Sequence, residues 1–303
     1  MSQSGGGLKS GIFYLVVGLL LAIVLNPAPA YSKRSAKGSQ SQSSRMPAKA
    51  AIVVDDNDLV IYAKSPKLRL PPASTTKLVT AMVVLDNLDP EKMVKISRRA
   101  ASIQTIKPRL RPGEELTVGD LLHLALMRSI NPSTYALAEE VAGSEKAFTR
   151  LMNQKAAEIG AMDTRFVNTS GLPKKGQYTT VYDLTLILKK SLEYPLIKEI
   201  LGKKEALIVS GSGRRLFIRN TDRLLWTKEN MIGGKTGFTR QARHCFVGAL
   251  ETDRGPILIA ILGASSRDRL WRTAQLLFRI ASNRQVLSSA ESTLPEKRKN
   301  NKG

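Results

Sequence analysis

Histidine and cysteine are almost absent from this chain of 303 residues, which contains two of the first and one of the second. His123 lies in the apolar run LLHLALM, where a packed ring is the more ordinary role, so a Ser-His-Asp triad is poorly supplied. The chain has no HExxH, no CxxC and no aspartate-rich loop, and we therefore predict no metal site and no cofactor. A hydrolase built from this sequence needs a base other than histidine.

The single cysteine, Cys245, cannot form a disulfide within the chain. Beside Phe246-Val247 it is predicted to be a small apolar residue of a strand. His244 is its neighbour, but adjacent residues of a strand point to opposite faces of a sheet. A catalytic cysteine–histidine couple is therefore disfavoured.

Acidic residues are also scarce, because 25 Asp and Glu stand against 47 Lys and Arg, for a formal net charge of +22. A charge of this size favours attraction to polyanions or anionic surfaces. Aromatic residues make up only 5% of the chain and no recognition motif is present, so we expect no nucleic-acid partner. Two interpretations stay open, a weak association with the anionic cell envelope and a charge that only maintains solubility.

The first 30 residues have the order of a secretory signal peptide, with Lys9, an apolar run over residues 12–25 and then Ala28-Pro29-Ala30. The apolar run, of about 14 residues, is short for a membrane span, which favours a cleaved signal over a retained anchor. We therefore predict export, with cleavage left open.

Two further segments flank the predicted domain. Residues 31–47 are rich in Ser, Gln and Lys, which predicts a flexible linker. Residues 283–303 end in EKRKNNKG, which predicts a disordered basic tail. Residues 48–282 between them are sufficient to bury one substantial core and are predicted to form a single domain.

Within residues 48–282 a hairpin precedes a block of helices, and strands and a last helix follow. Apolar spacing predicts helices at 74–87, 116–128, 131–142, 145–159, from about Thr180, and at 266–281, and strands at 51–54, 59–63, 206–210, 216–220, 245–251 and 256–262. Thr117, Asn131 and Ser144 are predicted helix caps. This order predicts an α+β fold, with an antiparallel sheet assembled from both ends of the domain around a helical insertion.

Ser74-Thr75-Thr76-Lys77 opens the helix predicted at 74–87, whose sequence is apolar on nearly every face. A lysine three residues after a serine lies on the same face of a helix, so its amine can reach the hydroxyl group and act as its base. The backbone N–H groups at a helix start also suit a developing oxyanion. Alone, the pattern equally fits a capped helix with a surface lysine, but an apolar helix is a buried one.

Two more short motifs follow along the chain. Ser129-Ile130-Asn131 joins two predicted helices, where Asn131 can equally be an N-cap ahead of Pro132. Lys235-Thr236-Gly237 lies at a glycine-flanked strand edge, where an extended peptide can pair and present its carboxylate. In this order the three motifs are the S-x-x-K, S-x-N and K-T-G triplet of serine enzymes that bind β-lactams.

Around these motifs, residues 48–282 resemble the D-alanyl-D-alanine carboxypeptidases, the low-molecular-weight penicillin-binding proteins of peptidase family S11. The similar segments are PPASTTKLVTAMVVLD, RPGEELTVGDLLHLALMRSINPSTYALAE, GAMDTRFVNTSGLPKKGQYTTVYDL, FIRNTDRLL and GGKTGFT. The resemblance implies a β-lactamase/DD-peptidase-like fold, an antiparallel sheet flanked by helices with an all-helical subdomain. It also implies a penicillin-sensitive enzyme that removes the terminal D-alanine of peptidoglycan stem peptides, in the periplasm or on the outer face of the cytoplasmic membrane.

The resemblance assigns roles to the three motifs. Ser74 forms the acyl-enzyme, Lys77 is its general base, and Ser129 relays a proton toward the leaving amine. The N–H groups of Ser74 and Phe238 form the oxyanion hole, although many relatives carry histidine or tyrosine where this chain has Phe238.

The remaining residues are assigned to the substrate. Asn131 holds its backbone, and Lys235 and Thr236 bind its terminal carboxylate beside Gly237. Burial beside a second cation, Lys235, is expected to lower the pKa of Lys77, which must lose its proton to act.

Three other functions compete with this one. A class A β-lactamase adds a glutamate after the second motif, whereas Asp163 is the only acid between residues 160 and 180, so slow deacylation is predicted. A D,D-endopeptidase that cuts peptidoglycan crosslinks is the alternative within the family, and a non-catalytic wall-binding protein is an alternative of another class. The sequence leaves the stem-peptide chemistry and the oligomeric state open.

Overall fold

The structure is a computed structural model that describes residues 46–292, with side chains described as far as residue 282. The predicted signal peptide lies outside the described residues, as do most of the predicted linker and the end of the predicted tail. Within the described part, no helix is both long enough and apolar enough to cross a membrane.

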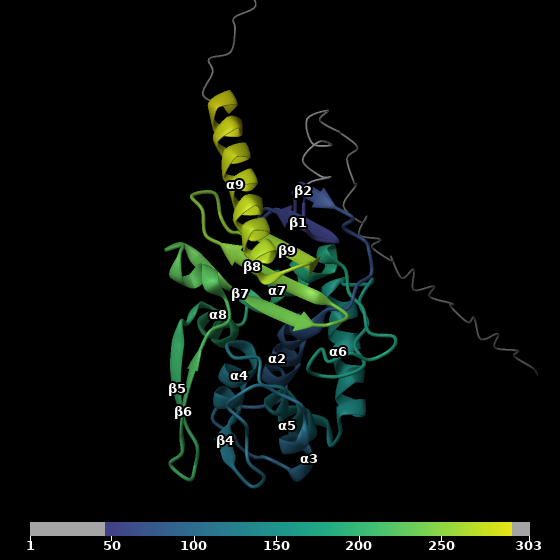
Figure 1. Cartoon of the computed structure of the whole chain (residues 1–303), viewed down its shortest axis with the longest axis vertical. Helices are drawn as coiled ribbons and strands as arrows, with labels where there is room; N and C mark the ends of the chain where they lie inside the picture. Colours follow the sequence, from purple (N-terminus) through teal and green to yellow (C-terminus); the bar gives the residue numbers. More distant parts are fainter. Residues whose placement is uncertain (1–45, 293–303) are drawn as a thin grey trace, which may run out of the picture. The chain divides into compact units, whose positions relative to one another are not determined.

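Five antiparallel strands form the main sheet, in the order β2-β1-β9-β8-β7 (Figure 1). The strands are β1 (Ala50–Val54), β2 (Val60–Lys64), β7 (Met231–Thr239), β8 (Arg243–Leu250) and β9 (Ile257–Ala264). The first two come from the start of the domain and the other three from its end, which confirms the prediction of a sheet assembled from both ends. β7 is an edge strand, so one row of its backbone groups has no neighbouring strand.

Both faces of this sheet are buried. Along β9, alternate residues from Ile257 to Ile261 pack with α9 (Arg267–Ser292), and those from Leu258 to Leu262 pack in the other core. α7 (Val181–Leu192) lies against β1, β8 and β9 on this second face (Figure 1). Because successive side chains of a strand point to opposite faces, a strand covered on both sides has a continuous apolar sequence, here ILIAILGA.

The helix α2 (Lys77–Leu85) lies at the centre of the helical part and is buried at every residue except Leu85. It contacts α7 and three other helices: α4 (Val118–Leu126), α5 (Asn131–Ala142) and α6 (Glu145–Ile159). One turn of 3-10 helix, η1 (Ala73–Thr76), precedes it, so Ser74 lies just before α2 and not within it.

The helical part also contains two short sheets that the resemblance to an all-helical subdomain does not predict. β3 (Met93–Lys95) pairs with β4 (Glu115–Thr117), and β5 (Glu205–Val209) pairs with β6 (Arg215–Arg219). Thr117 has extended backbone and caps α4 by accepting a hydrogen bond from Asp120 N, so the residues before it are free to pair with β3. The remaining short elements are α3 (Arg98–Ser102), α8 (Pro195–Gly202) and η2 (Arg223–Trp226).

Two predicted boundaries need correction. Met46 is only 3% exposed, and its carbonyl oxygen accepts a hydrogen bond from Lys64 Nζ at 2.8 Å, so the packed domain begins before residue 48. At the other end, α9 continues to Ser292, beyond the predicted start of the tail at residue 283. The segment NRQVLSSAES contains neither Gly nor Pro, so nothing in it ends the helix.

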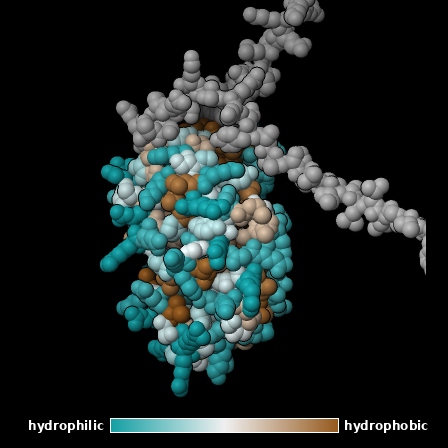
Figure 2. All heavy atoms as spheres, turned by 90° about the vertical axis from the view of Figure 1, so that its right-hand side faces the viewer, coloured by the Kyte–Doolittle hydropathy of each residue, from teal (hydrophilic) through white to brown (hydrophobic). Residues whose placement is uncertain are grey.

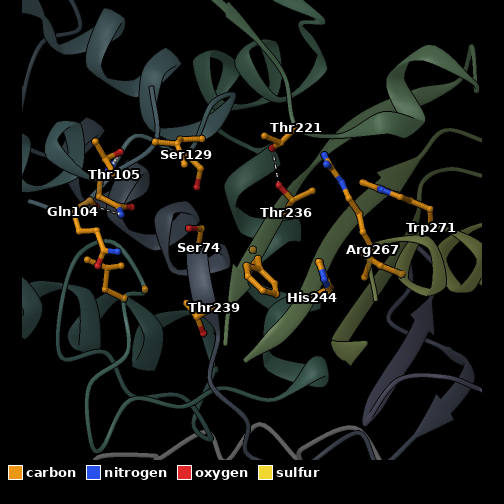
Figure 3. Close-up of a pocket in the computed structure, with 17 residues that line it drawn as sticks. Ser74, Gln104, Thr105, Ser129, Thr221, Thr236, Thr239, His244, Arg267 and Trp271 are labelled. Carbon is orange, nitrogen blue, oxygen red and sulfur yellow. Dashed lines mark hydrogen bonds between the residues drawn. The ribbon is translucent and has the colours of Figure 1, made fainter. Parts of the chain in front are cut away.

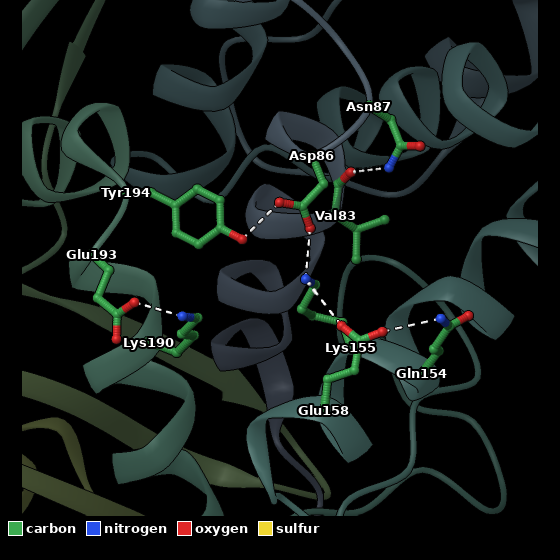
Figure 4. Close-up of polar contacts among 9 residues, drawn as sticks. All are labelled: Val83, Asp86, Asn87, Gln154, Lys155, Glu158, Lys190, Glu193 and Tyr194. Atoms are coloured by element: carbon green, nitrogen blue, oxygen red, sulfur yellow. Dashed lines mark hydrogen bonds and ion pairs between the residues drawn. The ribbon is translucent and has the colours of Figure 1, made fainter.

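A polar network anchors the C-terminal end of α2. Asp86 accepts a hydrogen bond from the Tyr194 hydroxyl group at 2.7 Å and pairs with Lys155 of α6 at 2.9 Å (Figure 4). Burial, together with the bond to Asp86, raises the pKa of Tyr194 to about 12. Ion pairs this close to solvent contribute at most about 1 kcal/mol, so the network orients α2 while the apolar core holds it. The face of the molecule shown in Figure 2 is mostly hydrophilic, with scattered apolar side chains.

Candidate active site

A pocket of about 430 Å³ lies between the edge strand β7 and the helical part (Figure 3). Its wall includes Ser74 of η1, Ser129 and Asn131 at the start of α5, and Thr236 of β7. All three sequence motifs therefore contribute to one cavity, although they are far apart along the chain.

Ser74 and Lys77 are placed by a tight, internally bonded turn. The Thr75 hydroxyl group donates to Pro72 O at 2.8 Å and that of Thr76 donates to Ala73 O at 2.9 Å. This turn brings Lys77 Nζ to 3.0 Å from Ser74 Oγ, which is hydrogen-bonding distance.

The Lys77 amine has two further partners, Asn131 Oδ1 and Ser170 O, each at 2.7 Å. A neutral amine has two N–H donors and one lone pair, and these two carbonyl oxygens can only accept. If the amine donates to both, its lone pair is directed at the third neighbour, the hydroxyl group of Ser74. The geometry thus suits a neutral lysine that removes the proton of Ser74.

The electrostatic surroundings favour the same protonation state. Lys77 is 0% exposed, and burial lowers its pKa well below the usual value, with the charge of Lys235 lowering it further. Both causes are the ones expected from the sequence.

The structure corrects the predicted capping role of Asn131. The N-cap position of α5 is Ile130, and Asn131 is the first residue of the helix itself. Its side chain points away from the helix backbone, donating from Nδ2 to Gln104 O at 2.6 Å while Oδ1 accepts from Lys77. Because the amide is bonded at both ends, its oxygen is held toward the lysine.

Ser129 lines the same pocket near Ser74 (Figure 3). Its φ of 65° lies in the left-handed region, which costs a non-glycine residue free energy and is found mainly where the surroundings impose it. Among the residues that the structure describes, its hydroxyl group has no hydrogen bond to Ser74 or Lys77. The structure thus brings Ser129 to the pocket without bonding it to the other two.

The residues of the third motif lie at different depths. Thr236 lines the pocket, and its hydroxyl group is 2.6 Å from that of Thr221. Thr221 Oγ1 donates to Met127 O, so Thr236 is the donor in this pair. Lys235 is 0% exposed, donates from Nζ to Thr236 O at 3.0 Å, and is not part of the pocket wall.

Lys235 is electrostatically coupled to a buried carboxylate, Asp222. Burial lowers the pKa of Lys235 to about 7 although Asp222 acts to raise it, and burial raises the pKa of Asp222 to about 7. Asp222 Oδ1 accepts from Leu224 N at 2.9 Å, whereas Oδ2 has no hydrogen-bond partner among the described residues. The sequence alone does not identify Asp222, because an Asp before a turn is also an ordinary cap.

Two glycines pack closely against the turn that carries Ser74. A Cβ atom at Gly237 would lie 2.8 Å from Ser74 N. At Gly171, where φ is +82°, a Cβ atom would lie 1.7 Å from Ala73 O. Phe238 follows Gly237 and is 55% exposed, and its ring centroid lies 4.4 Å from that of His244, with the two rings tilted by 35°.

Sequence reasoning missed other residues of the pocket wall, notably Arg267 and Trp271 of α9, and Thr221. In Figure 3 the Arg267 side chain extends toward Thr236. His244 also lines the pocket, but His123 does not: its Nδ1 is bonded to Gly119 O at 2.8 Å and its ring is packed in α4. In the sequence, the signal for these residues is weak and consists of the arginines in the first turn of α9. Their place on the pocket wall follows from the packing of α9 on the sheet, which the sequence does not show.

No carboxylate lines this pocket among the described residues. Asp163, the only acid between residues 160 and 180, pairs instead with Arg69 at 2.6 Å. The described residues likewise contain no cluster of His, Cys, Asp and Glu suited to a metal ion. The chemistry available here is that of a hydroxyl nucleophile with an amine base.

Comparisons with known proteins agree with this geometry. The family model described as D-alanyl-D-alanine carboxypeptidase matches residues 36–266. The chain is 32% identical to the D-alanyl-D-alanine carboxypeptidase DacF of Bacillus subtilis over 83% of this chain and 65% of that protein, so it spans slightly less than two thirds of that relative. It is 36% identical to the D-alanyl-D-alanine endopeptidase of Escherichia coli over 84% of this chain and 85% of that protein.

The fold has solved counterparts as well. The crystal structure of a D-alanyl-D-alanine carboxypeptidase from Mycobacterium tuberculosis H37Rv superposes with a TM-score of 0.74 at 31% identity, covering 78% of this chain and 91% of that one. The α+β fold of the DD-peptidases predicted from the sequence is thereby confirmed.

The contact between Gly171 and the Ser74 turn gives a first prediction. In Gly171→Ala the new methyl group meets Ala73 O and displaces the turn, so acylation by a fluorescent penicillin should fall at least about 100-fold, the effect of a misplacement near 1 Å. Gly176→Ala is the matched control, because Gly176 also has positive φ (+86°) but no atom within 4 Å of the new Cβ. The control should lose only about 1 kcal/mol of stability in thermal unfolding. Equal labelling of the two variants would contradict the contact.

A second prediction concerns Asp222 and pH. Asp222→Asn keeps the cap of η2 but removes the charge that raises the pKa of Lys235, so Lys235 loses its proton at lower pH. The alkaline limb of the acylation rate therefore moves to lower pH. Neutral Lys235 no longer lowers the pKa of Lys77, so the acidic limb moves to higher pH and the profile narrows.

The control for this titration is Asp163→Asn, which removes a carboxylate paired with Arg69 outside the pocket. Its profile should match that of the unmodified protein. Identical profiles for Asp222→Asn and Asp163→Asn would show that Asp222 does not set the charge of Lys235.

Proposed function

This chain belongs to the D-alanyl-D-alanine carboxypeptidase family, and on that premise we propose that it is a serine peptidase that removes the terminal D-alanine of peptidoglycan stem peptides. The observation that carries the proposal is the Lys77 amine, buried and 3.0 Å from the Ser74 hydroxyl group. Export to the periplasm or to the outer face of the cytoplasmic membrane is part of the proposal, since the substrate lies there.

In the first step neutral Lys77 takes the proton of Ser74 as Oγ attacks the carbonyl carbon between the two D-alanines. The N–H groups of Ser74 and Phe238 stabilise the resulting oxyanion. The proton taken by Lys77 then passes through the hydroxyl group of Ser129, on the pocket wall near Ser74, to the leaving amine, so that Lys77 is neutral again. Water then hydrolyses the acyl-enzyme and returns Ser74 to its free form.

Substrate binding uses the edge strand β7. An extended peptide can pair with the free side of β7, as peptides do with exposed sheet edges, while Asn131 holds its backbone from the opposite wall. The terminal carboxylate meets Thr236 at the surface, the charge of Lys235 behind it, and Arg267 from α9. An arginine is well suited to a carboxylate because its N–H groups can bond both oxygens.

The pocket also supports sensitivity to penicillin. Penicillin acylates such a serine, and rapid release needs a base that activates water on the acyl-enzyme. The absence of any carboxylate from the pocket wall among the described residues supports slow release. We therefore propose that β-lactams inhibit this protein and are not its substrates.

Endopeptidase activity on crosslinked stems is the second candidate. It is favoured by the 36% identity to the E. coli endopeptidase, which this chain matches over 85% of that protein's length. A wall-binding protein without catalytic activity is less well supported, since nucleophile and base lie within hydrogen-bonding distance.

Labelling by fluorescent penicillin tests the nucleophile and its base. The unmodified protein should be labelled and Ser74→Ala should not. Lys77→Met should slow labelling about 10²- to 10⁴-fold, the contribution typical of a general base. Ser102→Ala, an exposed serine of α3 outside the pocket, is the control and should label normally. Labelling of Ser74→Ala at the normal rate would refute the assignment.

A digest of muropeptides separates the two activities. Purified protein is incubated with a monomeric pentapeptide and with crosslinked dimers, and the products are resolved by mass. Loss of one alanine from the monomer is expected for the carboxypeptidase, whereas conversion of dimers to monomers identifies the endopeptidase. If Ser74→Ala yields the same products as the unmodified protein, neither activity belongs to this site.

A further inference from the structure

A second concave surface, a groove of about 660 Å³, is lined almost wholly by basic side chains. They come from residues 107–111, from the segment just after α4, and from β6 with the residue before it. The six are Lys107, Arg109, Arg111, Arg128, Arg214 and Arg219.

Among the described residues, two of these cations have a carboxylate partner. Arg214 bonds both carboxylate oxygens of Glu114 at 3.0 Å, and Arg219 pairs with Glu205 at 2.8 Å. Within the described part of the chain, no carboxylate lies within ion-pair distance of the other four. Like charges gathered in a concavity produce a field that attracts an anion.

The groove adjoins the candidate active site through two short segments. Residues 104–106 line the catalytic pocket, and residues 107–109 line the groove. Ser129 belongs to the pocket and its neighbour Arg128 to the groove. Arg128 also donates from Nε to Lys107 O at 3.2 Å, so the two segments are joined.

An exposed aromatic side chain also lines the groove. Phe217 of β6 is 61% exposed and pairs across the ribbon with Leu207, which lies outside the groove lining and is 46% exposed. The lining therefore suits a chain that carries acidic groups and some apolar surface.

We propose that this groove binds a carboxylate-bearing segment of a second wall peptide while the first stem occupies the catalytic pocket. The inference rests on the proposed function and refines it, because such a groove favours crosslinked or polymeric substrate over an isolated stem. It also gives a location to a small part of the basic excess of the chain, whose net charge is +22.

The test compares two substrates on one double variant, Arg109→Gln with Arg111→Gln. Both side chains are exposed and have no acidic partner among the described residues, so folding should be kept, which thermal unfolding checks. The substrates are a crosslinked muropeptide dimer and a blocked tripeptide that ends in D-Ala-D-Ala and has only its terminal carboxylate. The ratio of kcat/KM on the dimer to kcat/KM on the tripeptide should fall about tenfold, mainly through KM on the dimer.

The matched control is Lys146→Gln with Arg150→Gln on α6, which removes the same charge on the opposite side of the molecule from β6 (Figure 1). Both residues are exposed, and the ratio should be unchanged. For the unmodified protein the ratio should also fall as salt is raised, because salt screens exposed charges.

Three results overturn the inference. One is a ratio in the groove variant that equals the ratio of the unmodified protein. Another is an equal loss in both double variants, which indicates net charge alone. The third is loss of binding to phosphatidylglycerol vesicles in the groove variant while the ratio stays fixed, which assigns the groove to a lipid surface. If instead the unmodified protein cleaves neither substrate and is not labelled by penicillin, the proposed function itself has failed.

Discussion

The buried amine of Lys77 is the contact on which the arrangement of the site depends. It joins three segments that are distant in the sequence: the turn that carries Ser74, the start of α5 at Asn131, and the carbonyl group of Ser170. Removing an ammonium group from water costs several kcal/mol, so a lysine that is 0% exposed is tolerated only with good partners or with a lowered pKa. Here the fold provides both, and the same oxygen atoms that accept its N–H groups direct its lone pair toward Ser74.

Local sequence predicted the elements better than the contacts between them. The apolar sequence of α2 and ILIAILGA of β9 each imply burial by themselves, and both helix caps at Thr117 and Ser144 form as expected. Asn131 is different. An Asn before Pro132 fits a helix cap, but in the structure Asn131 is the first residue of α5. Its side-chain oxygen accepts a hydrogen bond from Lys77, which is 54 residues away in the sequence. The role of Asn131 is therefore set by a partner that is distant in the sequence, and a local sequence pattern cannot indicate that partner.

The same limit explains Lys235, Arg267 and Gly171. Neighbouring residues of a strand point to opposite sides of the sheet. Because Thr236 lines the pocket, Lys235 lies on the enclosed side. The motif alone had suggested that Lys235 contacts the substrate directly. Arg267 reaches the pocket only because α9 packs across β8 and β9. Gly171 belongs to none of the three motifs. It matters because a Cβ atom at position 171 would lie 1.7 Å from the carbonyl oxygen of Ala73.

Two buried lysines of the site differ in their acidic surroundings, and this difference influences their protonation. Asp222 raises the pKa of Lys235 against the effect of burial, whereas burial and the charge of Lys235 both lower the pKa of Lys77. Near pH 7 Lys235 therefore keeps part of the positive charge that suits a carboxylate, while its surroundings favour the neutral form of Lys77 that suits a base. In the proposed function, a substrate carboxylate near Thr236 adds a second negative charge beside Lys235 and favours the protonated form of this lysine, which is the form that binds a carboxylate.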